Sequence, residues 1–487
     1  MPYSLLKEVK KTKIIATIGP RSESKRVIRQ LIECGLNVVR LNASHQSDPQ
    51  TMKKIVGRIR QVSKECRKPV GILLDLQGPK IRVGRIRSGK IMLRNGQDIV
   101  LTPEKVMGTS RRLSISYADI VNDVNVGDPV FIDDGNIRLV VTEVRLKDVV
   151  CKVEQGGILS NYKGINVPRS EVHMSAITEK DRRDLKIAVE NKLDFVALSF
   201  VKDAADIHEL RGLLKELGNS QIAIIAKIER PSAVTHIESI IKASDGVMVA
   251  RGDLGVEIGT EHVPEVQKMI IREANRLIKP VVVATQMLES MITKKVPTRA
   301  EVSDVANAIY DRCDAVMLSG ESAVGIDPAN SVLAMRTICE ATDGHLVRLR
   351  QIDGIVPVID PELRDETATY AIAADHIATQ SKAAALMVFT ERGFAPLISS
   401  KLNPGFPIIA VTDRPAAVTR VALYRGVIPL YMKNFEGAKR WSDMINLAIL
   451  RAKEYQLVKS GDTVVVAARV QSSKLGGLNS IRSVVVP

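Results

Sequence analysis

Short apolar segments, each followed by polar residues and then by a stretch of helical character, recur along most of this chain. Strands of a parallel sheet have this appearance, because both of their faces are buried and they read as nearly continuous apolar runs. Eight such strands are predicted, three before residue 79 and five after residue 176. They are Thr12–Thr17, Asn37–Asn42, Val70–Asp75, Phe195–Phe200, Ile222–Ile228, Val247–Ala250, Val281–Thr285 and Ala315–Leu318.

Eight strand-helix units predict a TIM (β/α)8 barrel, in which polar residues at the carboxyl ends of the strands form the active site. A doubly wound open sheet is the alternative. That fold commonly carries a GxGxxG motif after its first strand, and no such motif follows Thr17. The number of units therefore favours the α/β barrel, which we expect to comprise residues 1–78 and 176–346.

Two regions depart from the barrel pattern. Residues 79–175 contain only short β-like runs separated by turn residues, such as Lys90–Leu93 and Val149–Val153, and they predict an inserted all-β domain. The helical pattern resumes at Thr178 to Asp181, which resembles a capping box. Residues 347–487 again alternate helix and strand patterns, and they predict a separate open α/β domain.

Charge and composition limit the classes of function. The chain has 70 basic and 55 acidic residues and a net charge of +15, which suits either a nucleic acid or a small polyanionic substrate. Aromatic residues make up only 3%, so aromatic side chains that stack on the bases of single-stranded nucleic acid are not expected.

The five cysteines lack metal-site spacing and are expected to be reduced. Without a membrane-length apolar run or a signal-peptide core, we expect a cytoplasmic protein with no membrane contact.

The stretch from Met248 to Gly259 carries the clearest functional signal. Its buried strand runs directly into Asp253, and the preceding strand ends with Lys227 and Glu229. Two carboxylates beside one lysine suit Mg²⁺, which keeps several waters and takes substrate oxygens as further ligands. The lysine would offset charge that develops on the substrate. The alternative is that these residues only form ion pairs with one another at a solvated rim.

Ordered motifs over nearly the full length resemble those of the pyruvate kinases, of the potassium-independent, bacterial-like type. The matching stretches are Thr12–Pro20, Val39–Asn42 with Ser44 and His45, Leu74–Arg82, Lys163–Asn166, Ala226–Glu229, Met248–Glu257, Ala284–Met291 and Met317–Glu321. The resemblance implies Mg²⁺-dependent phosphoryl transfer from phosphoenolpyruvate to ADP, giving pyruvate and ATP, as the last step of glycolysis. Mn²⁺ could replace Mg²⁺. A homotetramer under allosteric control is the usual form of the family.

The resemblance also assigns roles to particular residues. Glu229 and Asp253 would bind the metal ion, and Lys227 would lie beside the moving phosphoryl group. The catalytic residues would be Lys227, Thr285 and Arg40, and the substrate would contact these three together with Arg251, Gly252 and Asp253. Thr285 would help to deliver a proton to the enolate carbon.

The implied nucleotide site draws on two parts of the chain. Asn42, Ser44, His45 and Arg82 would lie at the barrel mouth, and Lys163 would reach over from the insertion. The insertion would therefore close as a lid, with hinges near Pro79 and Pro168, and shield the transfer from water. Where the family usually has Asn-Phe-Ser-His-Gly, this chain has Ala43 and Gln46, so the loop lacks an aromatic side chain and a glycine.

Two further positions bear on regulation and on cations. Lys80 stands where potassium-dependent members carry glutamate, so its ammonium group could replace a bound K⁺ ion and make K⁺ unnecessary. Thr390, Arg392, Gly393 and Phe394 join a predicted strand to a helix start, where free N–H groups favour a phosphate. They resemble the effector site of regulated pyruvate kinases, for AMP or a sugar phosphate, with residues 471–480 as a cover. An ordinary strand-helix turn is the alternative.

Two other functions remain open from the sequence. A Mg²⁺-dependent barrel lyase or aldolase acting on pyruvate or oxaloacetate would need the same metal and lysine, but it would have no use for Lys163 or a lid. A basic nucleic-acid-binding protein without catalysis would instead show strongly salt-dependent retention on DNA. Direct partners expected from the resemblance are phosphoenolpyruvate and ADP or ATP, not nucleic acid.

Overall fold

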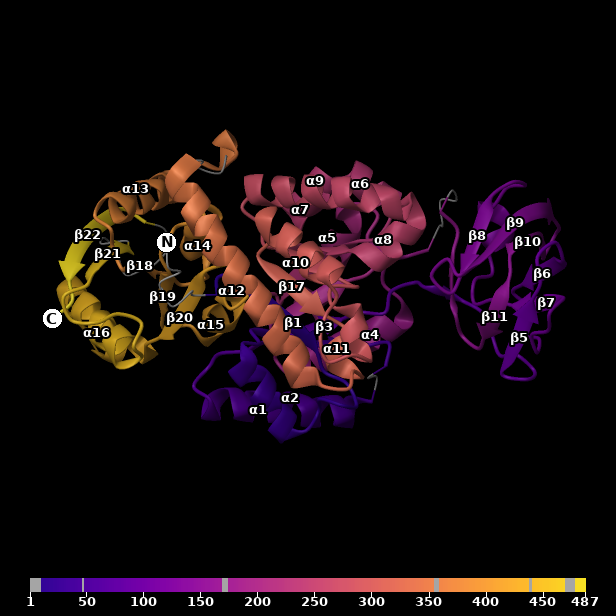
Figure 1. Cartoon of the computed structure of the whole chain (residues 1–487), viewed down its shortest axis with the longest axis horizontal. Helices are drawn as coiled ribbons and strands as arrows, with labels where there is room; N and C mark the ends of the chain where they lie inside the picture. The colour runs from indigo at the N-terminus through magenta and orange to yellow at the C-terminus, as the bar shows by residue number, and fades with distance from the viewer. Residues whose placement is uncertain (1–9, 46–47, 169–173, 354–358, 438–439, 469–477) are drawn as a thin grey trace.

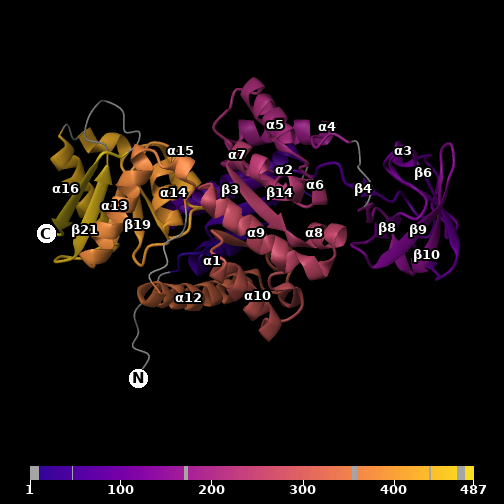
Figure 2. The same cartoon turned by 90° about the horizontal axis from the view of Figure 1, so that it is seen from above.

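The computed structural model describes residues 10–45, 48–168, 174–353, 359–437, 440–468 and 478–487. Three units follow one another along its longest axis (Figure 1). A barrel lies in the middle, a β insertion made of strands β4 to β12 lies at one end, and a carboxyl-terminal α/β unit lies at the other. The same order is seen from above (Figure 2).

The central unit is a closed barrel of eight parallel strands in the order β1-β17-β16-β15-β14-β13-β3-β2. The predicted TIM barrel is therefore confirmed, and the open doubly wound sheet is wrong. Its strands are β1 Lys13–Thr17, β2 Val38–Asn42, β3 Gly71–Asp75, β13 Phe195–Leu198, β14 Ala223–Ile228, β15 Gly246–Ala250, β16 Val281–Ala284 and β17 Ala315–Leu318.

Helices cover the outside of the barrel, and their ends follow local sequence signals. Ser24 caps α1 and Gly35, with φ of 114°, ends it in the left-handed conformation that glycine tolerates. Thr178 and Asp181 form the predicted capping box at the start of α4. The helices are α1 Lys25–Cys34, α2 Pro49–Glu65, α4 Glu179–Glu190, α5 Ala204–Glu216, α6 Pro231–Thr235, α7 Ile237–Ala243, α8 Arg251–Ile258, α9 Val263–Arg276, α10 Arg299–Tyr310, α11 Gly320–Ala323 and α12 Pro328–Asp353, with short 3-10 turns at Thr260–His262 and Glu289–Ile292.

Two barrel strands end earlier than the sequence predicts. The strands expected to reach Phe200 and Thr285 stop at Leu198 and Ala284. Phe200 has φ of 56° and Thr285 has φ of 72°, and an L-residue with such a backbone cannot continue a strand. Backbone strain of this kind is concentrated at functional sites, so both turns indicate a constraint beyond barrel closure.

The β insertion has its own core and two sheets. Seven strands pair in the order β4-β12-β8-β9-β10-β6-β7, and β11 pairs with β5. The prediction of an all-β insertion needs one correction, because the helix α3 Ile120–Asp123 interrupts it. The strands are β4 Ile81–Arg82, β5 Lys90–Leu93, β6 Asp98–Thr102, β7 Arg112–Ser114, β8 Pro129–Ile132, β9 Ile137–Val144, β10 Val149–Gln155, β11 Gly157–Ser160 and β12 Gly164–Asn166.

The carboxyl-terminal unit is an open five-stranded sheet in the order β20-β19-β18-β21-β22, with only β22 antiparallel. The strand β22 was not predicted from the sequence. The boundary expected between residues 346 and 347 falls inside α12, which continues to Asp353. The elements are a 3-10 turn Pro361–Leu363, α13 Glu366–Gln380, β18 Ala385–Phe389, α14 Phe394–Lys401, β19 Ile408–Thr412, α15 Pro415–Val421, β20 Val427–Tyr431, a 3-10 turn Lys433–Gly437, α16 Trp441–Glu454, β21 Thr463–Ala468 and β22 Ser480–Val485.

The state of the cysteines and the absence of a membrane-spanning segment were both predicted from the sequence. All five cysteines are free thiols, as predicted. In the part of the chain that the structure describes, no helix combines the length and the apolar character needed to cross a membrane.

Candidate functional site

Lys227 lies at the centre of a charged cluster on the carboxyl-end face of the barrel. It stands two residues before Glu229 near the end of β14, so both side chains project to the same side of the strand. The Lys227 Nζ lies 2.8 Å from Glu229 Oε1 and 3.3 Å from Asp75 Oδ1, and it donates a 2.9 Å hydrogen bond to Ser199 Oγ. Strands β3, β13 and β14 are neighbours, which explains how residues far apart in sequence meet here.

Arg40 joins this cluster from β2 through Asp75. Its Nε donates to Asp75 Oδ2 at 2.7 Å, and its Nη1 donates to Thr17 Oγ1 at 3.0 Å. Burial alone would raise the pKa of Asp75, but the ammonium of Lys227 and the guanidinium of Arg40 outweigh it and hold that pKa below its usual value. Burial would lower the pKa of Lys227, yet Asp75 and Glu229 raise it, so the lysine is held as a cation.

Glu229 is fully buried and only partly satisfied. Its Oε2 accepts a 2.7 Å hydrogen bond from the backbone N–H of Phe200. Lys227 Nζ forms a 2.8 Å ion pair with the other oxygen, Oε1, which has no hydrogen bond among the described residues. Burial, and then the charge of Asp253, raise the pKa of Glu229 against the opposing effect of Lys227. A buried carboxylate oxygen without a hydrogen bond is suited to a cation.

These features fit a divalent metal ion with few protein ligands. Among the described residues, no three His, Cys, Asp or Glu side chains are grouped as a metal site. Glu229 and Asp253 therefore could hold a metal only together with water or substrate oxygens, which is the usual arrangement for Mg²⁺. In this structure Asp253 Oδ1 accepts a 2.7 Å hydrogen bond from Lys80 Nζ.

Lys80 brings a fixed positive charge to the same place. Its Nζ also lies 3.7 Å from Asp134 Oδ1 of the β insertion, so it contacts both units. Burial would lower the pKa of Lys80, but Asp253 outweighs this effect and raises it. The side chain is therefore a permanent cation beside the expected metal ligand.

Thr285, Gly252 and Arg251 are brought together at the start of α8. The backbone N–H of Gly252 donates to Thr285 Oγ1 at 2.8 Å. Arg251 turns its side chain away from the cluster: Nη2 donates to the Thr285 backbone oxygen at 2.8 Å and Nη1 donates to Asp304 at 2.7 Å. The guanidinium thus holds the strained turn at Thr285, which leaves the backbone of Arg251 and Gly252 to face the site.

The residues expected at the nucleotide form two separate groups. On the barrel, Asn42 ends β2 and its Oδ1 accepts from the N–H of Ser44 at 3.0 Å, while His45 is exposed; Gln46 lies outside the described residues. Arg82, expected at the barrel mouth, belongs instead to β4 of the β insertion, where its Nη1 donates to the Tyr162 backbone oxygen at 3.0 Å. Lys163 of the same unit pairs with Asp133 at 2.7 Å. The β insertion stands away from the barrel, to which a narrow connection joins it (Figure 1).

The residues expected at an effector site lie where β18 meets α14. Thr390 is buried and its Oγ1 accepts from the N–H of Gly393 at 2.9 Å. Arg392 and Phe394 line a cavity of about 470 Å³. The cavity is also lined by Phe195, the first residue of the barrel strand β13. Of the expected cover, residues 471–480, the first seven (471–477) lie outside the described residues.

Sequence reasoning did not assign Asp75 and Ser199 to the site. Asp75 ends β3, and Ser199 directly follows β13 and donates a 2.7 Å hydrogen bond to the Leu76 backbone oxygen. The available signal was their position, because both stand at the carboxyl end of a predicted barrel strand. Only the strand order shows that Asp75 lies between Arg40 and Lys227.

The fold and the cluster define a TIM-barrel enzyme with an inserted β unit and a charged site at the carboxyl ends of its strands. Comparison with known families is specific. Residues 9–332 match the family model "Pyruvate kinase, barrel domain", and residues 368–484 match "Pyruvate kinase, alpha/beta domain".

Similar proteins cover nearly the whole chain. Pyruvate kinase from Geobacillus stearothermophilus is 42% identical over 479 residues, which are 97% of this chain and 80% of that protein. Pyruvate kinase from Clostridium perfringens is 39% identical over 478 residues, covering 97% of this chain and 99% of that protein. Pyruvate kinase from Staphylococcus aureus (strain MRSA252) is 39% identical over 476 residues, 97% of this chain and 80% of that protein. The chain belongs to the pyruvate kinase family.

Proposed function

We propose that the chain transfers the phosphoryl group of phosphoenolpyruvate to ADP, with Mg²⁺ as its metal ion, at the cluster around Lys227. The observation that carries this proposal is the meeting of Lys227 with the buried, partly unsatisfied carboxylate of Glu229 on the barrel face. A barrel lyase would not explain the relatives named pyruvate kinase over 97% of the chain. A nucleic-acid-binding role has no comparable support.

The chain's own residues would act mainly by position and charge, as is usual for phosphoryl transfer. Arg40 would bind the phosphate of phosphoenolpyruvate. The backbone at Arg251 and Gly252 would bind its carboxylate, for which the Gly252 N–H would exchange its present acceptor, Thr285 Oγ1, for the substrate. As the phosphorus–oxygen bond breaks and ADP oxygen takes the phosphoryl group, the Lys227 ammonium would stabilise the charge on the enolate oxygen. Thr285 Oγ1 would help to direct a proton to the enolate methylene carbon, which completes pyruvate.

Glu229 and Asp253 are the residues we assign to Mg²⁺, and Mn²⁺ has the same preference for oxygen ligands. When bound, the ion would neutralise negative charge on the substrate. To bind it, Asp253 would have to share its oxygens between the ion and Lys80, the lysine that now donates to Oδ1. The two carboxylates would fix the position of the ion, and Glu229 would do so from a buried setting.

Lys80 supports activity without K⁺. Its ammonium is held 2.7 Å from Asp253, so a positive charge is already fixed beside the site. We expect turnover in K⁺-free buffer balanced with tetramethylammonium to lie within about twofold of turnover in KCl, because a lysine can supply the charge of a bound cation. Lys80→Glu should reduce K⁺-free turnover about tenfold or more, and KCl should restore part of it. A wild-type enzyme that needs KCl would contradict this assignment.

An effector site at Thr390, Arg392, Gly393 and Phe394 is proposed on the geometry of a strand-helix turn next to an exposed arginine. Arg392 would bind the phosphate of AMP or a sugar phosphate. Addition of AMP, ribose 5-phosphate or fructose 1,6-bisphosphate should then shift the phosphoenolpyruvate saturation curve, and Arg392→Ala should abolish the shift. An unchanged curve with all three compounds would leave only an ordinary turn.

The remaining proposals concern organisation. We divide the chain into a catalytic barrel of residues 1–78 and 176–346, a lid of residues 79–175 and a regulatory unit of residues 347–487, and we expect a cytoplasmic homotetramer acting in the last step of glycolysis. Support comes from the separate core of the β insertion and from its narrow connection to the barrel (Figure 2). The barrel and the carboxyl-terminal unit each have a core cluster of their own, and they share a further one that contains Phe195 and Leu386. Closure of the lid would bring Arg82 and Lys163 to the nucleotide held by Asn42, Ser44 and His45.

A coupled assay tests the proposed function. Purified protein with phosphoenolpyruvate, ADP and Mg²⁺ is monitored through NADH oxidation by lactate dehydrogenase. We expect pyruvate only when ADP is present. Pyruvate formed at the same rate without ADP would contradict phosphoryl transfer to the nucleotide and would favour a lyase.

A further inference from the structure

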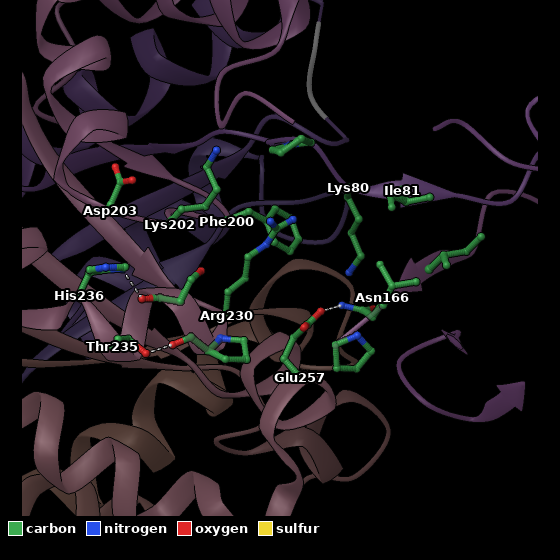
Figure 3. Close-up of a pocket in the computed structure, with 16 residues that line it drawn as sticks. Lys80, Ile81, Asn166, Phe200, Lys202, Asp203, Arg230, Thr235, His236 and Glu257 are labelled. Carbon is green, nitrogen blue, oxygen red and sulfur yellow. Dashed lines mark hydrogen bonds between the residues drawn. The ribbon is translucent and has the colours of Figure 1, made fainter. Parts of the chain in front are cut away.

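A hydrogen bond joins the β insertion to the helix that carries the proposed metal ligand. Asn166, the last residue of β12, is 5% exposed and its Nδ2 donates to Glu257 Oε1 at 2.7 Å (Figure 3). Glu257 belongs to α8, which lies on the side of the barrel facing the β insertion in both overall views. The contact borders a cavity of about 460 Å³ at the junction of the two units.

A second contact lies one turn earlier on the same helix. Asp253 and Glu257 are four residues apart, so their side chains lie on one face of α8. Asp253 contacts Lys80, which directly precedes β4, while Glu257 contacts the end of β12. One helical face thus contacts both segments of chain that connect the β insertion to the barrel.

The two connecting segments are also fixed to each other. Strand β12 pairs with β4, Gly164 opposite Arg82 and Ile165 opposite Ile81. A Cβ atom at Gly164 would lie 2.6 Å from Lys80 Cε, so β12 passes directly over the lysine, and any larger residue at this position would displace the lysine side chain. Movement of Asn166 would therefore be transmitted to Arg82 and to Lys163, the residue immediately before β12.

The contact between Asn166 and Glu257 buries polar groups at a cost in stability. Burial raises the pKa of Glu257, which means that keeping this carboxylate charged is unfavourable unless a partner compensates. Asn166 Oδ1 is buried as well, and it has no hydrogen bond among the described residues. A contact that only stabilised the fold would be served as well by apolar side chains. A directional polar contact instead fixes orientation.

We propose that Glu257 is a positioning residue for nucleotide binding: by holding Asn166 it sets the orientation of β12 and so places Lys163 and Arg82 above the barrel mouth. Helix α8 carries both Asp253 and Glu257, so it positions Asp253 in the site and, through Glu257, the end of β12 where the β insertion rejoins the barrel. This inference rests on the proposed function, since it assigns the nucleotide to Lys163 and Arg82.

The first test separates the two substrates. Glu257→Ala should raise the KM for ADP about tenfold, the effect of losing one hydrogen bond to a charged group. The KM for phosphoenolpyruvate should stay within about twofold, because that substrate is bound by barrel residues that do not depend on the lid. Glu190→Ala, an exposed glutamate at the end of α4, serves as the matched control and should change neither value. An equal rise in both KM values, or no rise for ADP, would overturn the proposal.

The second test exchanges donor and acceptor. Glu257→Gln keeps an acceptor for Asn166 Nδ2 and adds a donor for the unsatisfied Oδ1, so its KM for ADP should remain near the wild-type value. Asn166→Asp places two carboxylates together and should resemble Glu257→Ala. The double variant Asn166→Asp with Glu257→Gln restores one donor and one acceptor, and its KM for ADP should recover. The double variant regains the hydrogen bond but neither original side chain. If its KM for ADP did not recover, the hydrogen bond would not be what positions the nucleotide site, and the proposal would be overturned.

A third measurement needs no turnover. Hydrogen exchange of the peptide covering residues 160–167, without substrates, should be faster in Glu257→Ala than in the wild type and slow again in the double variant. If this exchange pattern is observed but the wild type forms no pyruvate from phosphoenolpyruvate and ADP, the proposed function fails while the positioning contact stands. Unchanged exchange in an active enzyme would overturn the positioning role alone.

Discussion

Lys227→Met is expected to abolish pyruvate formation from phosphoenolpyruvate and ADP, with a loss in kcat of about 10³-fold or more. Lys227 Nζ is the only charge that the described structure places within 3.3 Å of both Asp75 and Glu229 carboxylates, and methionine keeps most of its length without the charge. The coupled assay measures the loss. Since the missing interaction would form fully only in the transition state, kcat should fall far more than the KM for phosphoenolpyruvate rises.

Two controls separate chemistry from folding. Lys186→Met removes an exposed lysine from α4 and should leave turnover unchanged. In Lys227→Met, Asp75 still has Arg40 as a partner, so thermal unfolding followed by circular dichroism should remain cooperative. Turnover in a folded Lys227→Met variant within about tenfold of the wild type would remove the proposed role of this lysine.

Glu229→Gln is expected to produce the second largest effect. The amide is nearly isosteric, but it replaces the charged oxygen, Oε1, that has no hydrogen bond among the described residues. We expect the Mg²⁺ concentration for half-maximal rate to rise about tenfold or more, and kcat at saturating Mg²⁺ to fall about 10²-fold. Rates measured as a function of Mg²⁺ and of Mn²⁺ test this directly.

The pKa of Glu229 supplies a control for this variant. Because burial raises that pKa, the folded state takes up a proton there more readily than the unfolded chain, so keeping Glu229 ionised in the folded state carries a cost that a neutral amide avoids. The metal-free variant should therefore unfold at a temperature no lower than the metal-free wild type. A large fall in Tm, with unchanged Mg²⁺ dependence, would indicate a structural role instead of a metal ligand.

The barrel could be predicted because its information is local. Each barrel strand is a short apolar run, since both of its faces are covered, and polar residues mark its carboxyl end. The positions of Phe200 and Thr285 could not be read in this way. Their positive φ values are imposed by contacts from neighbouring strands, such as the carboxylate of Glu229 bonded to the N–H of Phe200. The helix and strand propensities of the residues in one segment do not predict such contacts.

The site was accessible from the sequence only in part. Lys227 and Glu229 are two residues apart on one strand, so their proximity follows from strand geometry alone. The pairing of Arg40 with Asp75, and of Asn166 with Glu257, depends on which elements become neighbours in space. The edge strand β22 has a local signal in its isoleucine and valines, which the prediction overlooked, but its antiparallel pairing with β21 could be seen only in the structure.

A crystal structure with Mn²⁺ and pyruvate would test the central claim most directly, because the anomalous signal of the metal locates it without assumptions. We predict one ion bound by Glu229 Oε1 and Asp253 at about 2.0–2.2 Å, with water or pyruvate oxygens completing its shell. Lys227 Nζ should lie beside the keto oxygen of pyruvate, the atom that carries the charge in the enolate. A metal ion bound elsewhere, with the carboxylates of Glu229 and Asp253 engaged only by Lys227 and Lys80, would contradict it.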